Sequence, residues 1–287
     1  MRSSNPVFSR RGFSRDGSQA GFHTGGQPQA GNPYATGPAA DNPYAANPYA
    51  QQPAGAPQGA PPAAPPSADR MTMDDVVSRT GITVGTVVAT ATVAWVTDLA
   101  LGPAFLFALV AMGLALVQAF KRTASPPLIL AYAAFEGLFL GAISNYVDNR
   151  IADGAAMQAV IGTMAVFAAV LFLYKARIIR VTQRFYRFVL AAAIGFILLM
   201  GVNLLFAAFG GGDGLGFRSG GLGILFGVIG IVLGACFLAL DFKQVEDGVA
   251  YGAPRKESWL AAFGLTLTLV WIYLEFLRLI AILQSDS

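Results

Sequence analysis

Seven long apolar runs follow one another along the chain, and short polar segments separate them. A helix needs about 20 apolar residues to cross the hydrocarbon core of a bilayer. Five runs reach that length; the first two are slightly short and flank a Gly-Pro turn that one continuous helix could not contain. The pattern predicts an all-α polytopic membrane protein with seven transmembrane helices, at about residues 82–97, 103–120, 127–147, 155–174, 187–209, 221–241 and 259–283.

The first 70 residues differ in composition from the rest, because Gly, Pro, Ala, Gln, Ser and Asn dominate them. Such a segment buries too little apolar area to offset the entropy lost on ordering. We therefore expect a disordered, Pro/Gly-rich cytoplasmic tail over residues 1–70 and a membrane domain over residues 71–284. Asn-Pro-Tyr recurs in the tail, either as a docking motif for a partner or as drift in low-complexity sequence, at 32–34, 42–44 and 47–49.

Composition narrows the chemistry open to the predicted membrane domain. Hydrophobic residues make up 55% of the chain and charged residues 12%, against roughly 25% charged in soluble domains. The single histidine, His23, lies in the tail, and the single cysteine, Cys236, lies in an apolar run. Histidine-based zinc hydrolysis, haem ligation and Ser-His proteolysis are therefore not expected within the membrane. No nucleophile is accompanied by a base, so we expect neither an enzyme nor a bound cofactor.

Lysine and arginine residues concentrate in alternate loops. If the N-terminus is cytoplasmic, the cytoplasmic loops hold ten of them and the outer loops hold two, Arg150 and Arg218. Because positive charge marks the cytoplasmic side, we expect a protein of the cell (inner) membrane with its N-terminus inside and its C-terminus outside. The ten are Lys121, Arg122, Lys175, Arg177, Arg180, Arg184, Arg187, Lys243, Arg255 and Lys256.

Five of these cations lie between the fourth and fifth runs, interleaved with Ile, Val and Phe. Two interpretations are open: the segment lies along the headgroups and binds anionic membrane lipid, or it only determines topology. Nucleic acid is not an expected partner, because so short a patch beside a membrane could engage few phosphates. The five cations are Lys175, Arg177, Arg180, Arg184 and Arg187.

Ionisable side chains inside the apolar runs are the main functional candidates, because an unpaired ion in a bilayer costs several kcal/mol. Glu136 lies near the middle of the third run. Glu275 and Arg278 are three residues apart in the last run, so they share one helical face and could pair, unless Arg278 snorkels to the surface. Asn203 is a milder polar residue that a clamp between helices would explain.

Asp241 closes the sixth run, and Glu275 lies on the run that follows. Two carboxylates held close together cannot both ionise cheaply, so they would share a proton that is lost near neutral pH. The ionised pair would offer oxygen ligands to a hard cation such as Ca²⁺. The alternative is structural: Asp241 caps a loop and Glu275 pairs with Arg278. Spacing alone leaves both interpretations open.

Two C-terminal motifs resemble those of the Bax inhibitor-1 family, the transmembrane Bax inhibitor motif proteins with YccA-like bacterial members. The motifs are Asp241-Phe242-Lys243-Gln244-Val245-Glu246, continued by residues 248–254, and Trp271-Ile272-Tyr273-Leu274-Glu275-Phe276-Leu277-Arg278-Leu279. The chain is similar to the actinobacterial branch in particular, which carries segments like Ser3-Ser4-Asn5-Pro6 and Phe135-Glu136-Gly137-Leu138-Phe139-Leu140-Gly141. The resemblance covers about residues 71–284.

This resemblance implies a bundle of seven helices in which six surround the last. It also implies a pH-sensitive pair of acidic residues that governs Ca²⁺ leak toward the cytosol, with Asp241 as its first member and Glu275 as its second. Glu275 stands where better-known members have Asp. Glu136 and Arg278 are further candidates for the ion pathway, and Glu246 joins Asn203 as a secondary polar candidate.

Two further features of the family bear on this chain. Known members have a basic latch residue on an earlier helix, whereas the first three apolar runs here contain no Lys or Arg, so that Arg278 would have to substitute. Other bacterial members modulate a membrane-bound ATP-dependent protease. The expected function is therefore a pH-sensitive Ca²⁺ leak, and the alternative is an interaction protein that restrains such a protease complex.

Overall fold

The computed structural model describes residues 69–121, 123–210, 217 and 219–285. The Asn-Pro-Tyr repeats, nearly all of the expected tail, Arg122 and Arg218 lie outside the described residues. The described part contains seven helices long and apolar enough to cross a membrane, which confirms the predicted fold class. They are α1 (Met73–Val96), α2 (Leu101–Phe120), α3 (Pro126–Arg150), α4 (Ala155–Lys175), α5 (Gln183–Gly210), α6 (Gly220–Ala250) and α7 (Ser258–Ser285), with the short helix η2 (Arg255–Glu257) before α7.

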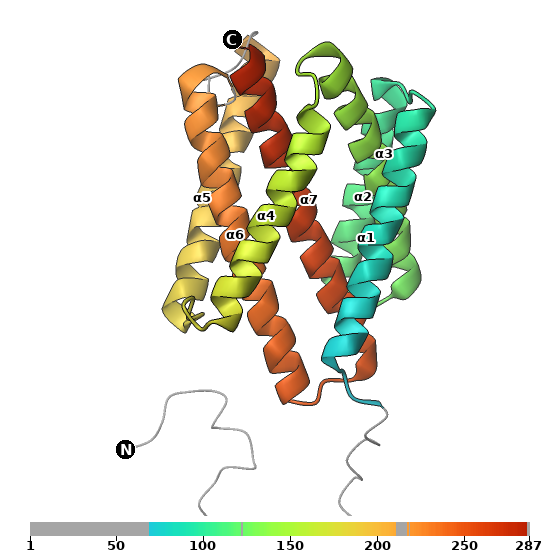
Figure 1. Cartoon of the computed structure of the whole chain (residues 1–287), viewed down its shortest axis with the longest axis vertical. Coiled ribbons are helices and arrows are strands. Elements are labelled where there is room, and N and C mark those ends of the chain that lie inside the picture. Colours follow the sequence, from blue (N-terminus) through green and yellow to red (C-terminus); the bar gives the residue numbers. More distant parts are fainter. Residues whose placement is uncertain (1–68, 122, 211–216, 218, 286–287) are drawn as a thin grey trace, which may run out of the picture. The chain divides into compact units, whose positions relative to one another are not determined.

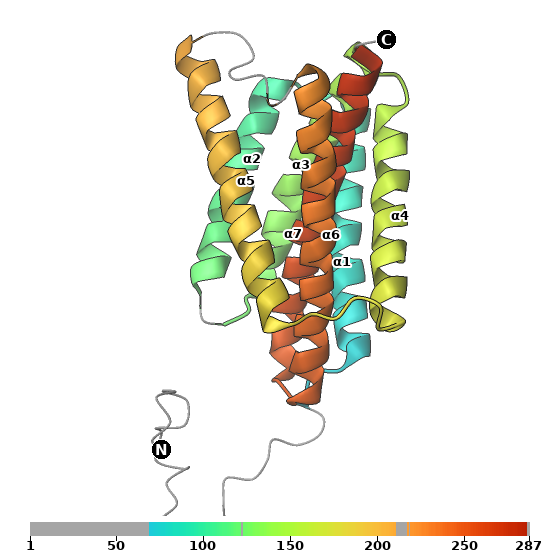
Figure 2. The ribbon, with the colours of Figure 1, turned by 90° about the vertical axis from the view of Figure 1, so that its left-hand side faces the viewer.

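The last helix, α7, lies in the interior of the bundle, as expected. It packs against α1, α3, α4 and α6. The ring of Trp271 on α7 also lies 5.8 Å from the ring of Phe196 on α5, and α2 joins the bundle through α3. Figure 1 shows α7 crossing the bundle obliquely, and Figure 2 shows the other helices standing around it. Polar residues in the middle of α7 therefore face other helices.

Glycines on α3 allow the close approach of α1. A Cβ atom on Gly141 would lie 2.8 Å from the Cα atom of Ala91, and one on Gly137 would overlap the backbone of Val87. Small residues at a spacing of four let helix backbones pack closely in a membrane. Gly137 and Gly141 therefore serve the packing of α3 against α1.

Two helices extend beyond their apolar runs. Helix α1 begins at Met73, because Thr72 and Asp75 form a capping box that satisfies its first backbone N–H groups. Helix α6 continues for about two and a half turns past Asp241, to Ala250. The segment after Asp241 is therefore helical, so Asp241 does not cap a loop. Arg79 lies in α1 before the first apolar run, and Arg150 ends α3 after the third, so two of the first three helices contain a basic residue although their apolar runs do not.

Candidate functional site

Asp241 lies inside helix α6 and faces the central helix. The Thr268 hydroxyl on α7 donates a hydrogen bond to Asp241 Oδ2 at 2.6 Å. Asp241 is half-buried and Thr268 is buried. A Cβ atom on Gly264, one turn earlier on α7, would lie 3.5 Å from Asp241 Oδ1. The carboxylate is thus held against α7 by one hydroxyl, at a place where α7 has a glycine.

Glu275 lies further along α7 and forms an ion pair with Arg278. Glu275 Oε2 lies 2.6 Å from Arg278 Nη2, and each side chain is only 13% exposed. The carboxylate packs against α6 at Gly230, where an added Cβ atom would lie 2.7 Å from Glu275 Cδ. The structure therefore contains the intrahelical pair that the spacing allows.

The two carboxylates that the sequence groups together are separated in the structure. Helices α6 and α7 run antiparallel, in a register that places Gly230 beside Glu275 and Asp241 beside Thr268. Gly230 and Asp241 are about three turns, or roughly 16 Å, apart along α6. Because Ca²⁺ ligands lie within about 2.6 Å of the ion, one ion cannot bind both carboxylates here. The hypothesis that Asp241 and Glu275 form a joint metal site is not supported by this geometry.

Glu136 is half-buried on α3, at about the same height along α7 as Asp241. One turn before it, Tyr132 packs edge-on against Phe263 of α7 with ring centroids 5.2 Å apart. One turn after it, Leu140 packs with Val270 of α7. Glu136 therefore lies level with residues 264–268 of α7. Within the described ranges no ion pair involves Glu136.

Hydroxyl groups contact α7 at two further levels along its axis, and neither contact was predicted from the sequence. Thr83 of α1 and Thr266 of α7 share a buried hydrogen bond of 3.0 Å. Ser144 of α3 and Tyr273 of α7 share one of 2.6 Å. Threonines recur on α1 at spacings of three and four residues, and this spacing was the available signal for a polar face.

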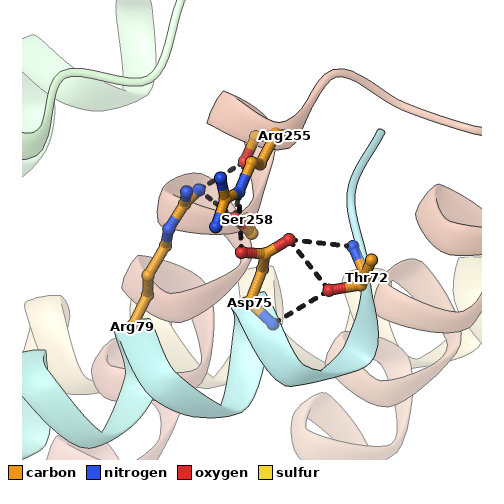
Figure 3. A network of polar contacts seen from close by, with 5 residues as sticks. All are labelled: Thr72, Asp75, Arg79, Arg255 and Ser258. Atoms are coloured by element: carbon orange, nitrogen blue, oxygen red, sulfur yellow. Dashed lines mark hydrogen bonds and ion pairs between the residues drawn. The ribbon is translucent and has the colours of Figure 1, made fainter. Parts of the chain in front are cut away.

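A network of polar contacts, here called the clasp, joins the start of α1 to the connection between α6 and α7. It consists of Thr72, Asp75, Arg79, Arg255 and Ser258 (Figure 3). Asp75 accepts hydrogen bonds from the Thr72 hydroxyl and from Arg255 Nε, both at 2.8 Å. Arg79 donates to the Ser258 hydroxyl and to the carbonyl of Arg255.

The backbone reinforces the clasp. The Met71 N–H donates to the Ala253 carbonyl at 2.8 Å, and Arg70 and Pro254 form an isolated β-bridge. The guanidinium of Arg79 also lies 5.4 Å from the Trp259 ring centroid. The clasp therefore fixes where α7 begins relative to α1, and with it the height of Thr268.

The secondary polar candidates occupy separate places. The Glu246 carboxylate, on the last turns of α6, accepts a hydrogen bond from the Tyr174 hydroxyl of α4. Asn203 is buried on α5, and its side-chain oxygen accepts a hydrogen bond from the Phe217 N–H at 3.4 Å. Asn203 thus binds the α5–α6 connection, whereas a clamp between two helices was expected.

The five cations between the fourth and fifth runs are exposed, and none forms an ion pair with another described residue. Lys175 ends α4, and Arg184 and Arg187 lie in the first turns of α5. Arg177, in the connection, has a φ of 57°. The described ranges contain no group of three or more His, Cys, Asp or Glu residues that could hold a metal ion.

Comparison with known proteins adds one finding. A family model described as Bax inhibitor 1 like matches residues 5–285, which is nearly the whole chain. A search among curated proteins finds no match.

Proposed function

The chain belongs to the Bax inhibitor 1 like family, and from this premise we propose that it forms a pH-sensitive leak pathway for Ca²⁺. The family and the seven apolar helices make it a multi-pass membrane protein. Burying an ionisable residue inside such a bundle costs free energy, so proteins seldom have one there without a functional reason. Such a residue is therefore by default a candidate for an ion pathway. We propose the cell membrane as the location, with the α6–α7 connection on the cytoplasmic side.

The contact between Asp241 and Thr268 carries this proposal. It places a carboxylate of α6 against the central helix, with the Thr268 hydroxyl 2.6 Å from Asp241 Oδ2. Glu136 lies at a similar height on α3 and offers a second carboxylate to the same level of the bundle. Glu275 is not grouped with these two carboxylates, because the ion pair with Arg278 already balances its negative charge.

The proposed pH response follows from the charge on Asp241. Ca²⁺ takes six to eight oxygen ligands, so Asp241 and Thr268 would supply only some of them and water the rest. At higher pH the ionised carboxylate attracts the cation. At lower pH the protonated carboxyl group is neutral, and that attraction is lost. Flux should therefore rise as the pH rises through the titration of Asp241.

Ca²⁺ flux into proteoliposomes, measured as a function of pH, tests the proposal. The native chain is compared with Asp241→Asn, which cannot ionise, and with Asp153→Asn, a matched change at an exposed aspartate between α3 and α4. We expect pH-dependent flux in the native chain and in Asp153→Asn, and pH-independent flux in Asp241→Asn. Absence of flux from every form at every pH would contradict the proposal.

The alternative is an interaction protein that restrains a membrane-bound protease complex. Deleting residues 1–68 distinguishes the two, because a leak through the helices should persist without the tail. A binding module that uses the tail should lose its function. The clasp lies after this deletion and should stay intact.

We also propose that the basic segment binds anionic lipid headgroups. Its cations are exposed and have no described acidic partners, and Ile178 between them is exposed as well. Each cation near an anionic membrane surface contributes about 1 kcal/mol of attraction. The segment is Lys175, Arg177, Arg180, Arg184 and Arg187.

A further inference from the structure

A cavity of about 450 Å³ opens at the end of the bundle opposite the clasp. The turn between α1 and α2 forms one wall, and the last two turns of α3 form the other. Its volume falls within the range of about 300–1,000 Å³ that small-molecule sites occupy. The charge distribution predicts that this end of the bundle is outside.

Two opposite charges line the cavity. Asp98 directly follows α1, and Arg150 is the last residue of α3. Neither side chain has a hydrogen bond or ion pair with another described residue. Asp98 has a φ of 49° because it follows the end of α1 in a Schellman motif, in which the Asp98 N–H donates to the Trp95 carbonyl at 3.2 Å. The end of α1 therefore fixes the backbone of Asp98 at the cavity. The cavity therefore presents one free anion and one free cation within the described part of the chain.

The floor of the cavity is polar and fixed. Asn145 is only 8% exposed. Its amide donates to the Trp95 carbonyl at 3.0 Å, and its oxygen accepts from the Asn149 amide at 2.5 Å. Since both groups of Asn145 are engaged, it orients Asn149 at the cavity wall and leaves the charged residues to bind a ligand.

The first turn of α2 contributes to the same wall. Helix α2 starts at Leu101, and Ala100 before it provides no side-chain cap. The first N–H groups of such a helix have no partner within the helix and carry partial positive charge. Together with Arg150, they favour an anionic group on this side of the cavity.

Exposed apolar side chains lie at the same end of the helices as the cavity. Val96 on α1 and Phe105 on α2 are exposed, and Tyr146 on α3 lines the cavity itself and is also exposed. Tyrosine is typical of the level at which headgroups meet acyl chains. A ligand here would have its polar group in the cavity and apolar chains beside the helices, which describes a lipid.

We propose that this cavity binds the zwitterionic headgroup of a phospholipid that has a primary ammonium group. The phosphate would lie near Arg150 and the start of α2, and the ammonium would donate hydrogen bonds to Asp98. A primary ammonium has three N–H donors, whereas a trimethylammonium group has none, so the site should distinguish the two. The inference is independent of the proposed ion leak and of the basic segment at the other end of the bundle.

Lipid binding to the delipidated full chain in detergent, measured by native mass spectrometry, tests the inference. The probes are phosphatidylethanolamine, phosphatidylcholine and phosphatidylglycerol with matched acyl chains. The variants are Asp98→Asn and Arg150→Gln, and the controls are Asp153→Asn and Lys121→Gln, at exposed positions that do not line the cavity. Both Asp and Asn tolerate the left-handed conformation, so Asp98→Asn should fold. If it does not, Asp98→Gly removes the carboxylate without steric cost at this φ.

We expect phosphatidylethanolamine to bind the native chain roughly tenfold more tightly than the other two lipids, as one charge-assisted hydrogen bond would provide. That preference should disappear in Asp98→Asn and persist in both controls. Arg150→Gln should weaken the binding of all three lipids, because each of them has the phosphate that Arg150 would contact. Competition by free glycerophosphoethanolamine would support the same site with a soluble zwitterion as its ligand. Equal binding of phosphatidylethanolamine and phosphatidylcholine to the native chain, an unchanged preference in Asp98→Asn, or unchanged lipid binding in Arg150→Gln would overturn the inference.

Discussion

Replacing Gly141 by alanine should weaken the bundle, because α1 and α3 have no room for one more methyl group there. The added Cβ atom would lie 2.8 Å from both Cα and the carbonyl carbon of Ala91, whereas ordinary contacts begin at 3.4 Å. The obstructing atoms belong to backbone, so the helices themselves must move apart. Overpacking of this kind costs about 1–3 kcal/mol. Alanine recovers about 0.5–1 kcal/mol through its higher helix propensity, which leaves a net loss of about 1–2 kcal/mol.

Gly85→Ala on α1 is the matched control, because a Cβ atom there would meet no other atom within 4 Å. The free energy of unfolding can be measured in mixed micelles by raising the fraction of sodium dodecyl sulfate, with helix content as the signal. We expect Gly141→Ala to unfold at a lower fraction than the native chain, and Gly85→Ala at the same fraction or a higher one. A Gly141→Ala variant as stable as Gly85→Ala would refute the close α1–α3 contact.

Two further predictions concern the end of the bundle at which the clasp lies. Arg79→Gln should lower the midpoint temperature of thermal unfolding, because it removes the clasp's contact with Ser258. Asp74→Asn, at an exposed neighbouring position, should leave the midpoint unchanged. Equal midpoints for the two variants would count against the clasp. Replacing Arg180 and Arg184 by Gln should weaken binding of the protein to anionic lipid by about 1 kcal/mol per charge. Native mass spectrometry with phosphatidylglycerol measures this binding. Unchanged binding would indicate that the segment only determines topology.

The seven helices could be predicted from the sequence because a bilayer imposes one length and one composition on every span. The ends of the helices could not be predicted in the same way, because a helix can continue through polar residues beyond the apolar run, as α1 and α6 do. The Thr72–Asp75 capping box was visible as a Thr followed three residues later by an acid. Used as a helix start, it would have placed Arg79 in the first helix.

The site was harder to predict than the fold. Asp241 stands out in the sequence because it is charged, but its partner Thr268 is one of several threonines in apolar runs. The pairing depends on the register between α6 and α7, which in turn depends on how far α6 continues before it ends. The expected partner, Glu275, lies about two turns along α7 from the observed partner, Thr268. The positions of apolar residues in the sequence do not determine the register between α6 and α7.

The claim that Asp241 acts with Thr268 and separately from Glu275 is tested most directly by a double-mutant cycle on Ca²⁺ flux. The variants are Asp241→Asn, Thr268→Val and Glu275→Gln, alone and in the two pairs that include Asp241, each measured in proteoliposomes across pH. We expect Thr268→Val to change the pH dependence of flux in the native background and to have no further effect on Asp241→Asn, because the residues are in contact. Glu275→Gln should have the same effect with or without Asp241→Asn. Additive effects of Asp241 and Thr268, together with coupling between Asp241 and Glu275, would contradict the account.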